Sequence, residues 1–193
     1  MTATEWAIVV LSLKVGGIAV LFTLPLAFGL AWLLARSSFP GKVVLDGLVH
    51  LPLVLPPVVT GWLLLLLFAP EGPVGMLVDD LFGASVLFRW SGAAIAAGVM
   101  ALPLMVRAIR LSLEAVDKRL EEAARALGAG RTRTFVRITL PLALPGILTG
   151  TIIGMARALG ETAPLLLIGM RAFVATPPDG FPSPATVLPV QIF

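Results

Sequence analysis

The feature that most constrains this fold is a set of four apolar runs about as long as a bilayer is thick. They cover residues 6–34, 48–68, 91–106 and 140–170. A hydrocarbon core about 30 Å thick is crossed by about 20 apolar residues of helix. Because a backbone in lipid must satisfy its own hydrogen bonds, such runs form helices. We therefore expect an all-α, polytopic membrane protein with about four transmembrane helices.

The composition excludes most soluble classes of protein. Hydrophobic residues make up 58% of the 193 positions and charged residues 13%, whereas a soluble domain has about 25% charged residues. A soluble enzyme, a disordered chain and a fibrous repeat are thus excluded. The sequence has no cysteine, and we found no metal-ligating cluster, paired acids or nucleophile beside a base. We expect no catalytic residue, no metal and no cofactor bound by this chain.

The basic residues indicate how the chain is oriented. Ten of the 14 lysines and arginines lie in residues 36–47 and 107–137, whereas two lie in residues 69–90 and 171–193. Positively charged loops stay in the cytoplasm, which places the N-terminus outside and agrees with an even number of spans. Because these charges flank spans, we expect contact with membrane lipid and no nucleic-acid partner.

The second apolar run is interrupted by prolines. Three of them lie between residues 52 and 57, so the first half of this run cannot form a regular helix. Freed carbonyls in a membrane survive only where protein or a wet cavity receives them. We expect the segment to face an interior, and Thr60 and Gly61 are pore candidates.

Residues 107–137 are too polar to cross a membrane, and an apolar stripe at helical spacing runs through them. The stripe consists of Ile109, Leu113, Val116, Leu120, Ala124 and Leu127. The other faces of this expected helix carry acid–base pairs four residues apart, namely Glu114 with Lys118 and Glu121 with Arg125.

A glycine-rich turn follows the stripe. Gly128 and Gly130 predict a helix stop, and we expect a second short helix over residues 132–138, turning back toward the membrane. The segment 107–141 is therefore predicted to be a helix–turn–helix that projects into the cytoplasm.

A sequence motif lies within this helix–turn–helix. The motif is E-A-A-x3-G-x9-I-x-L-P, formed by Glu122, Ala123, Ala124, Gly128, Ile138, Leu140 and Pro141. It resembles the cytoplasmic loop of permease subunits of bacterial binding-protein-dependent ABC importers. In that family the loop is a coupling helix that sits in a cleft of the ATPase subunit. The resemblance implies that these residues, together with Glu121, couple the chain to such an ATPase.

A helix lying on the membrane surface is the alternative interpretation of this segment. Against it, anionic headgroups would repel Glu121 and Glu122. The chain contains no G-x-x-x-x-G-K-[ST] phosphate-binding loop. The resemblance therefore implies that ATP and Mg bind the partner ATPase subunits.

The resemblance extends to an oxyanion branch of the family. Residues 50–61, 81–83, 88–90 and 105–117 are similar to the molybdate importer permease, and the likeness covers residues 8–160. It implies a homodimer with ATP-binding cassette subunits and a periplasmic oxyanion-binding protein, located in the bacterial inner membrane. We expect the chain, taken as one transmembrane domain over residues 1–193, to import molybdate by alternating access.

The C-terminal part departs from that pattern. Residues 157–193 resemble the phosphate importer permease, which would imply a heterodimer. Residues 171–193 form an atypical tail, for which truncation, fusion and a change of reading frame are alternatives. Phosphate import is thus the alternative function. From other classes, an ion-driven secondary transporter would need inverted repeats, and a non-transporting scaffold would leave the charge asymmetry unexplained.

The fourth apolar run carries two further features. Gly146, Gly150 and Gly154 lie four residues apart on one face, which permits close approach of another helix. That helix could belong to the same chain or to a second subunit. Arg157 and Glu161 lie one turn apart and are expected to pair. They either line the translocation path or steady the end of the helix.

The remaining single residues are assigned to the membrane boundary. We expect Lys14 to reach an interface and His50 to lie at one. The four tryptophans are expected to anchor the chain in the membrane, at Trp6, Trp32, Trp62 and Trp90.

Overall fold

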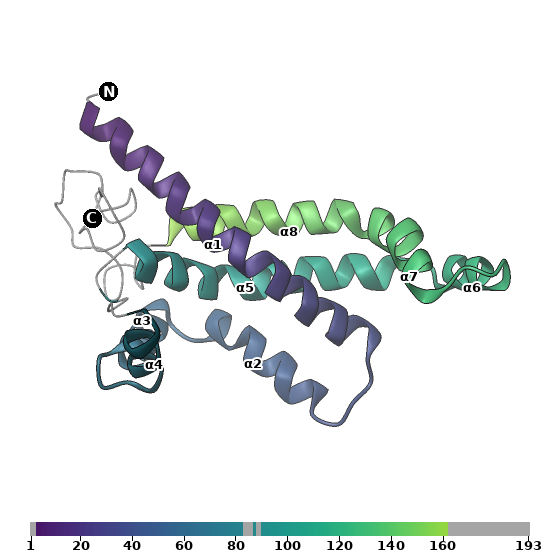
Figure 1. Ribbon diagram of the computed structural model, residues 1–193, viewed down its shortest axis with the longest axis horizontal. Helices are drawn as coiled ribbons and strands as arrows, with labels where there is room; N and C mark the ends of the chain where they lie inside the picture. Colours follow the sequence, from purple (N-terminus) through teal and green to yellow (C-terminus); the bar gives the residue numbers. More distant parts are fainter. Residues whose placement is uncertain (1–2, 83–86, 88–89, 162–193) are drawn as a thin grey trace.

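The computed structural model describes residues 3–82, 87 and 90–161, where it consists of helices and turns without a strand (Figure 1). The elements are α1 (Ala3–Arg36), α2 (Lys42–Val54), α3 (Pro57–Phe68), α4 (Pro73–Phe82), α5 (Trp90–Ala115), α6 (Lys118–Ala126), α7 (Arg131–Thr134), the π-helical turn η1 (Phe135–Thr139) and α8 (Leu140–Gly160). The all-α prediction is confirmed over this range. The tail 171–193 and the end of the fourth apolar run lie outside the described residues.

Three helical stretches are long and apolar enough to cross a membrane. They are Ile8–Arg36, Trp90–Ala115 and Arg131–Gly160. α2 and α3 are a fourth candidate as a pair, although they meet at an angle of 113°. The described residues therefore hold three spans, or four if the bent pair crosses as one, which agrees with the predicted number.

The bend between α2 and α3 lies where the sequence predicts irregular backbone. α2 ends at Val54, Leu55 is extended, and Pro56 precedes the first residue of α3, Pro57. Neither proline has an N–H to donate to a carbonyl four residues earlier. At the first position of a new helix, in contrast, proline is favourable. The prediction that the first half of this run is irregular is therefore wrong as far as Val54, because α2 is helical there with Pro52 inside it, and only the break at Leu55 and Pro56 is irregular.

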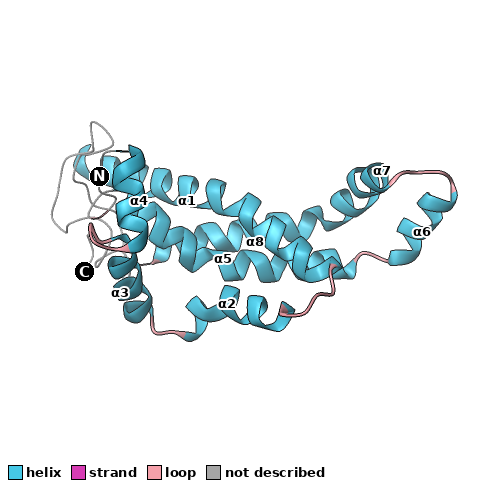
Figure 2. Cartoon of the chain, turned by 60° about the horizontal axis from the view of Figure 1, so that its bottom comes forward, coloured by secondary structure: helices cyan, strands magenta, loops and turns pink. Residues whose placement is uncertain are grey.

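α5 lies at the centre of the bundle. It packs against α1 and α8, and Figures 1 and 2 show α8 alongside it with α1 crossing them. Small residues dominate the buried part of α5, namely Gly92, Ala93, Ala94, Ala96, Ala97, Gly98 and Ala101. In lipid there is no hydrophobic driving force between helices, so close backbone packing of this kind holds spans together.

The glycine face of α8 packs against α5 of the same chain. A Cβ atom added to Gly154 would lie 2.6 Å from Sδ of Met105, and one added to Gly150 would lie 3.2 Å from Cβ of Ala108. A Cβ on Gly146 would collide with Ser112. Of the two alternatives for this face, the structure therefore shows packing within the chain.

Enlarging Gly154 should loosen the contact between α5 and α8. We expect Gly154→Leu to lower the free energy of unfolding by about 1–3 kcal/mol, because the added side chain overpacks the space held by Met105. The measurement is the thermal unfolding midpoint of the purified protein in detergent, followed by tryptophan fluorescence.

The matched control for this prediction is Gly29→Leu on α1. Gly29 is exposed, and a Cβ there meets nothing within 4 Å. Equal midpoints for the two variants would contradict the close packing described above.

Candidate functional site at the α6–α7 hairpin

α6 and α7 extend past the end of α5, away from α3 and α4 (Figures 1 and 2). Together with η1 they form a polar hairpin, here defined as residues 117–139. Its two arms are joined by a turn over residues 127–130. The hairpin contains the motif that the sequence analysis singled out, so its geometry decides which residues are available to a partner.

The first arm begins with a helix cap. The side chain of Asp117 accepts a hydrogen bond from the backbone N–H of Arg119 at 2.9 Å, and Asp117 itself is extended. This cap satisfies one of the free donors at the start of α6. The helix of α5 ends just before it, at Ala115.

This break corrects the prediction of one continuous apolar stripe. Ile109, Leu113 and Val116 are buried at the end of α5, whereas Leu120 is 48% exposed and Leu127 is 90% exposed. The residues do follow one helical spacing, but the cap at position 117 divides them between two helices. The stripe is therefore part core and part outer surface.

The turn has the glycine stop that the sequence predicts. Gly128 has a φ of +83°. Its N–H donates to the carbonyl of Arg125 at 2.9 Å, and the N–H of Ala129 donates to the carbonyl of Ala124 at 3.0 Å. This is a Schellman motif, which requires a left-handed residue at position 128.

The second arm differs from the predicted helix over 132–138. α7 is a single turn that continues through the π-helical turn into α8, and the N–H of Leu140 donates to the carbonyl of Phe135, five residues earlier. Pro141 explains the wide turn. It has no N–H, and its ring would clash in a regular α-helix with the carbonyl of Arg137.

A buried carboxylate fastens the first arm to the rest of the molecule. Glu121 is 8% exposed. Arg36, the last residue of α1, donates to both of its oxygens, at 2.6 Å to Oε1 and 3.1 Å to Oε2. Thr139, at the end of η1, donates to Oε1 at 2.8 Å.

This network was not predicted from the sequence. The predicted pair of Glu121 with Arg125 is present at 3.8 Å, but Arg36 lies closer to Glu121, at 2.6 Å. Glu121 is buried and not on an outer face. Arg36 and Glu121 are 85 residues apart in the chain, and no local pattern connects them. The sequence around Arg36 and around Glu121 gives no indication that these two residues pair.

The second arm is held to α1 by aromatic contacts. The ring of Trp32 meets Phe135 edge-on, with centroids 4.6 Å apart, and Phe28 lies 6.2 Å from the same ring. The guanidinium of Arg36 lies 5.7 Å from the centroid of Trp32. Trp32 was assigned to membrane anchoring, and this assignment needs correction because its ring packs on the hairpin.

The motif residues differ in their exposure. Glu122 and Ala123 are exposed on α6, and Ala124 is half-buried. Ile138 and Leu140 are half-buried, and Pro141 is exposed at the start of α8. Beside this face lies a polar cavity of about 470 Å³, whose lining includes Arg36, Lys118, Glu121, Glu122, Arg125 and Arg131.

A charged pair also joins α2 to α5, and a second pair lies within α5. Arg110 lies 3.1 Å from Asp46 and 2.8 Å from Glu114. The predicted pairing of Glu114 with Lys118 is replaced by this contact, because the helix breaks between them. His50, placed at an interface by the sequence analysis, has its Nδ1 atom 2.9 Å from the carbonyl of Asp46.

The pore candidates lie on elements at the opposite end of the bundle. Thr60 and Gly61 are buried in α3, and the Thr60 hydroxyl has no hydrogen-bond partner in the described part of the chain. Arg157 and Glu161 pair at 2.8 Å at the end of α8. In Figure 1, α3 and this end of α8 lie at the same end of the bundle.

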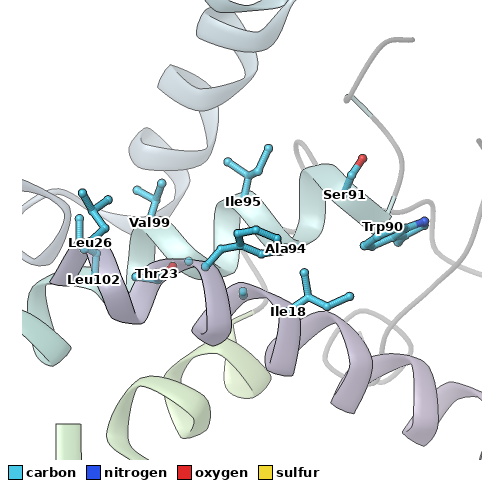
Figure 3. Close-up of a pocket in the computed structure, with 12 residues that line it drawn as sticks. Ile18, Thr23, Leu26, Trp90, Ser91, Ala94, Ile95, Val99 and Leu102 are labelled. Carbon is cyan, nitrogen blue, oxygen red and sulfur yellow. The ribbon is translucent and has the colours of Figure 1, made fainter. Parts of the chain in front are cut away.

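An apolar cavity of about 420 Å³ lies between parts of α1 and α5, which pack against each other elsewhere (Figure 3). Its lining contains the hydroxyls of Thr23 and Ser91 and otherwise carbon-rich side chains such as Ile18 and Trp90. Lys14 lies near this region, 5.3 Å from the centroid of Trp90. Among the described residues, those that line the cavity are uncharged.

The spans pack through small residues, and a polar hairpin is fixed to one end of the bundle. These features define the class as a helical membrane protein. The family described as "Binding-protein-dependent transport system inner membrane component" matches residues 6–193. The chain belongs to this family and is therefore a multi-pass, inner-membrane permease component. A system of this kind implies an ATPase and a binding protein as partners.

Named relatives fit the same family. The "Molybdenum transport system permease protein ModB" of Escherichia coli K12 is 58% identical over 161 residues, which are 83% of this chain and 70% of that protein. The protein of the same name from Azotobacter vinelandii is 34% identical over 189 residues, 98% of this chain and 80% of that one.

A solved structure supports the fold. A chain from the "Crystal structure of an amino acid ABC transporter with histidines" has a TM-score of 0.56 and 21% sequence identity. The match covers 80% of this chain and 69% of that chain. At this level of identity the likeness concerns the helical architecture.

Replacing Gly128 should destabilise the turn of the hairpin. We expect Gly128→Ala to cost about 1–2 kcal/mol locally, since an L-residue with a side chain is strained at positive φ. The end of α6 should then fray, and trypsin should cut at Arg125 and Arg131 faster than in the unsubstituted protein, as followed by mass spectrometry.

Gly130→Ala is the control for this effect. Gly130 has a φ of −66°, and a Cβ there meets nothing within 4 Å. If the two variants were cut at the same rate, the left-handed turn would not be what holds the end of α6.

Proposed function

We propose that this chain is the permease subunit of an ABC importer that moves an oxyanion, molybdate, into the cytoplasm. A partner ATPase binds ATP and Mg and supplies the energy. The observation that carries the proposal is the projecting hairpin, whose outer face presents Glu122 and Ala123 of the motif. The substrate is inferred from the similarity to the molybdenum permease of E. coli.

The hairpin has the surface that a protein partner needs. Leu127 is 90% exposed at its tip, and Leu120 is 48% exposed on α6, in a segment with many charges. These two leucines, exposed among charged side chains on a projecting hairpin, support a protein partner for this surface. A helix lying flat on lipid fits less well, because the tip leucine lies on a turn rather than along a stripe.

The mechanism that follows is alternating access. ATP binding draws the two ATPase subunits together, and each hairpin is carried with the subunit that holds it. The spans then reorient and open the path to the other side of the membrane, a rigid-body movement of packed helices. The chain itself has no phosphate-binding loop for ATP.

The proposed orientation puts the hairpin and Arg36 in the cytoplasm and the N-terminus outside. The contact between Arg36 and Glu121 supports it, since both residues must be on one side of the membrane. Residues 36–47 and 107–137, which carry most basic residues, then share the side that the positive-inside rule assigns to the cytoplasm.

Thr60, Gly61, Arg157 and Glu161 are proposed to lie along the anion path. The unpartnered hydroxyl of Thr60 supports this for α3. The pairing of Arg157 with Glu161 also suits the alternative, in which the two steady the end of α8. The complete importer is proposed to contain two permease copies, two ATPase subunits and a periplasmic oxyanion-binding protein.

The exposed acid of the motif offers the first test. Glu122→Lys should abolish ATP-dependent uptake of labelled molybdate while the amount of permease in the membrane stays unchanged, because the reversed charge lies on the proposed ATPase contact. Gly128→Pro should do the same by distorting the turn. Glu114→Lys reverses another exposed acid, on α5 and outside the hairpin, and should leave uptake near its normal level.

Normal uptake by Glu122→Lys would contradict the proposed coupling. Competition separates the substrates in the same assay. Unlabelled molybdate should suppress uptake and phosphate should not, whereas the reverse would assign the chain to phosphate. Uptake that persists without ATP and is lost when the ion gradients are collapsed would indicate a secondary transporter.

A further inference from the structure

One carboxylate joins several separate parts of the molecule. Glu121 on α6 receives hydrogen bonds from Arg36 at the end of α1 and from Thr139 at the end of η1, just before α8. The same guanidinium also donates to the carbonyl of Leu113 on α5, at 3.4 Å. The pair formed by Arg36 and Glu121 therefore has contacts to α1, α5, α6 and η1.

The last turns of α1 hold both arms of the hairpin. Phe28, Trp32 and Arg36 are spaced four residues apart and lie on one face of the helix. Arg36 holds the first arm through Glu121, and the two rings hold the second arm through Phe135. α1 is not adjacent to the hairpin in sequence, so these non-covalent contacts are what links the two.

The chain connections of the hairpin are weaker as mechanical links. On the α5 side, the helix is interrupted by Val116 and Asp117. On the α8 side, the path runs through the π-helical turn. α6 itself packs mainly against the other arm. Without the pair, α6 would be tied to the spans by an extended residue and a widened turn.

The chemistry of the pair favours fixed geometry over stability. The side chains of Arg36 and Glu121 are 16% and 10% exposed. A buried ion pair contributes little net stability, because desolvation offsets the attraction. The planar fork of arginine on a carboxylate, however, fixes distance and orientation at once.

We infer that the pair of Arg36 and Glu121 transmits movement of the hairpin to α1, so that both are positioning residues for transport. This inference rests on the proposed function, in which an ATPase moves the hairpin. It gives α1 a direct part in the transport cycle, in addition to the two helices that are continuous with the hairpin. Glu121 then acts through Arg36 and not by contact with the ATPase.

The test measures uptake per ATP hydrolysed in proteoliposomes that contain the permease, its ATPase and the binding protein, with molybdate as the probe. Glu121→Gln and Arg36→Gln should each lower this ratio about fivefold or more, the lower range of typical coupling between sites. The double variant should be no worse than either single one, because the two residues act as a unit.

Two further measurements separate transmission from a general structural defect. A cysteine placed at Leu127 should still crosslink the ATPase in Glu121→Gln, and ATP hydrolysis should persist. Glu114→Gln removes the partner of another ion pair, that of Arg110 on α5, which does not involve Arg36 or Glu121, and should leave the ratio unchanged.

An unchanged ratio in Glu121→Gln would overturn the inference, and so would a parallel loss of hydrolysis, uptake and crosslinking. If Glu121→Gln does not accumulate, Arg36→Lys decides in the same assay, since lysine keeps the charge but lacks the planar fork that fixes the carboxylate. A lowered ratio supports the inference and an unchanged ratio overturns it. Failure of the Leu127 cysteine to capture an ATPase in the otherwise unsubstituted chain would instead reject the proposed function.

Discussion

Close backbone contact at α5 is the constraint on which the rest of the structure depends. Lipid tails are as apolar as leucine, so spans are held together by packing and by satisfied polar groups. The glycines and alanines of α5, together with the glycine face of α8, allow this packing on both sides of one central helix. The hairpin is attached to the ends of α5 and α8, and the packing of these two helices fixes where it begins and ends.

The regular helices are interrupted at specific residues. The prolines at 56 and 57 separate α2 from α3, Asp117 separates α5 from α6, and Gly128 reverses the chain. Each interruption has a local chemical cause: a missing donor, a side-chain cap or a left-handed residue. Helical rods joined at such points can change their mutual angles while each rod keeps its own hydrogen bonds.

These local causes explain what could be predicted from the sequence. The apolar runs, the proline break and the glycine stop depend on neighbouring residues, and the structure has all three. The pairing of Glu121 with Arg36 and the packing of Trp32 on Phe135 depend on how distant helices meet, which no periodicity encodes. The glycines of α8 predicted that another helix approaches closely, but only the structure shows that this helix is α5. The stripe through Leu120 was misread because spacing alone does not reveal that Asp117 caps a new helix.

The corner between α2 and α3 has a consequence for the bilayer itself. Pro56 and Pro57 have no N–H, so the carbonyls of Pro52 and Leu53 lack the donors that an unbroken helix would supply. In the hydrocarbon core of a bilayer, such carbonyl oxygens are stable only where protein groups or water molecules donate hydrogen bonds to them. This corner therefore lacks hydrogen-bond donors, which a neighbouring protein group or a water molecule has to supply inside a membrane.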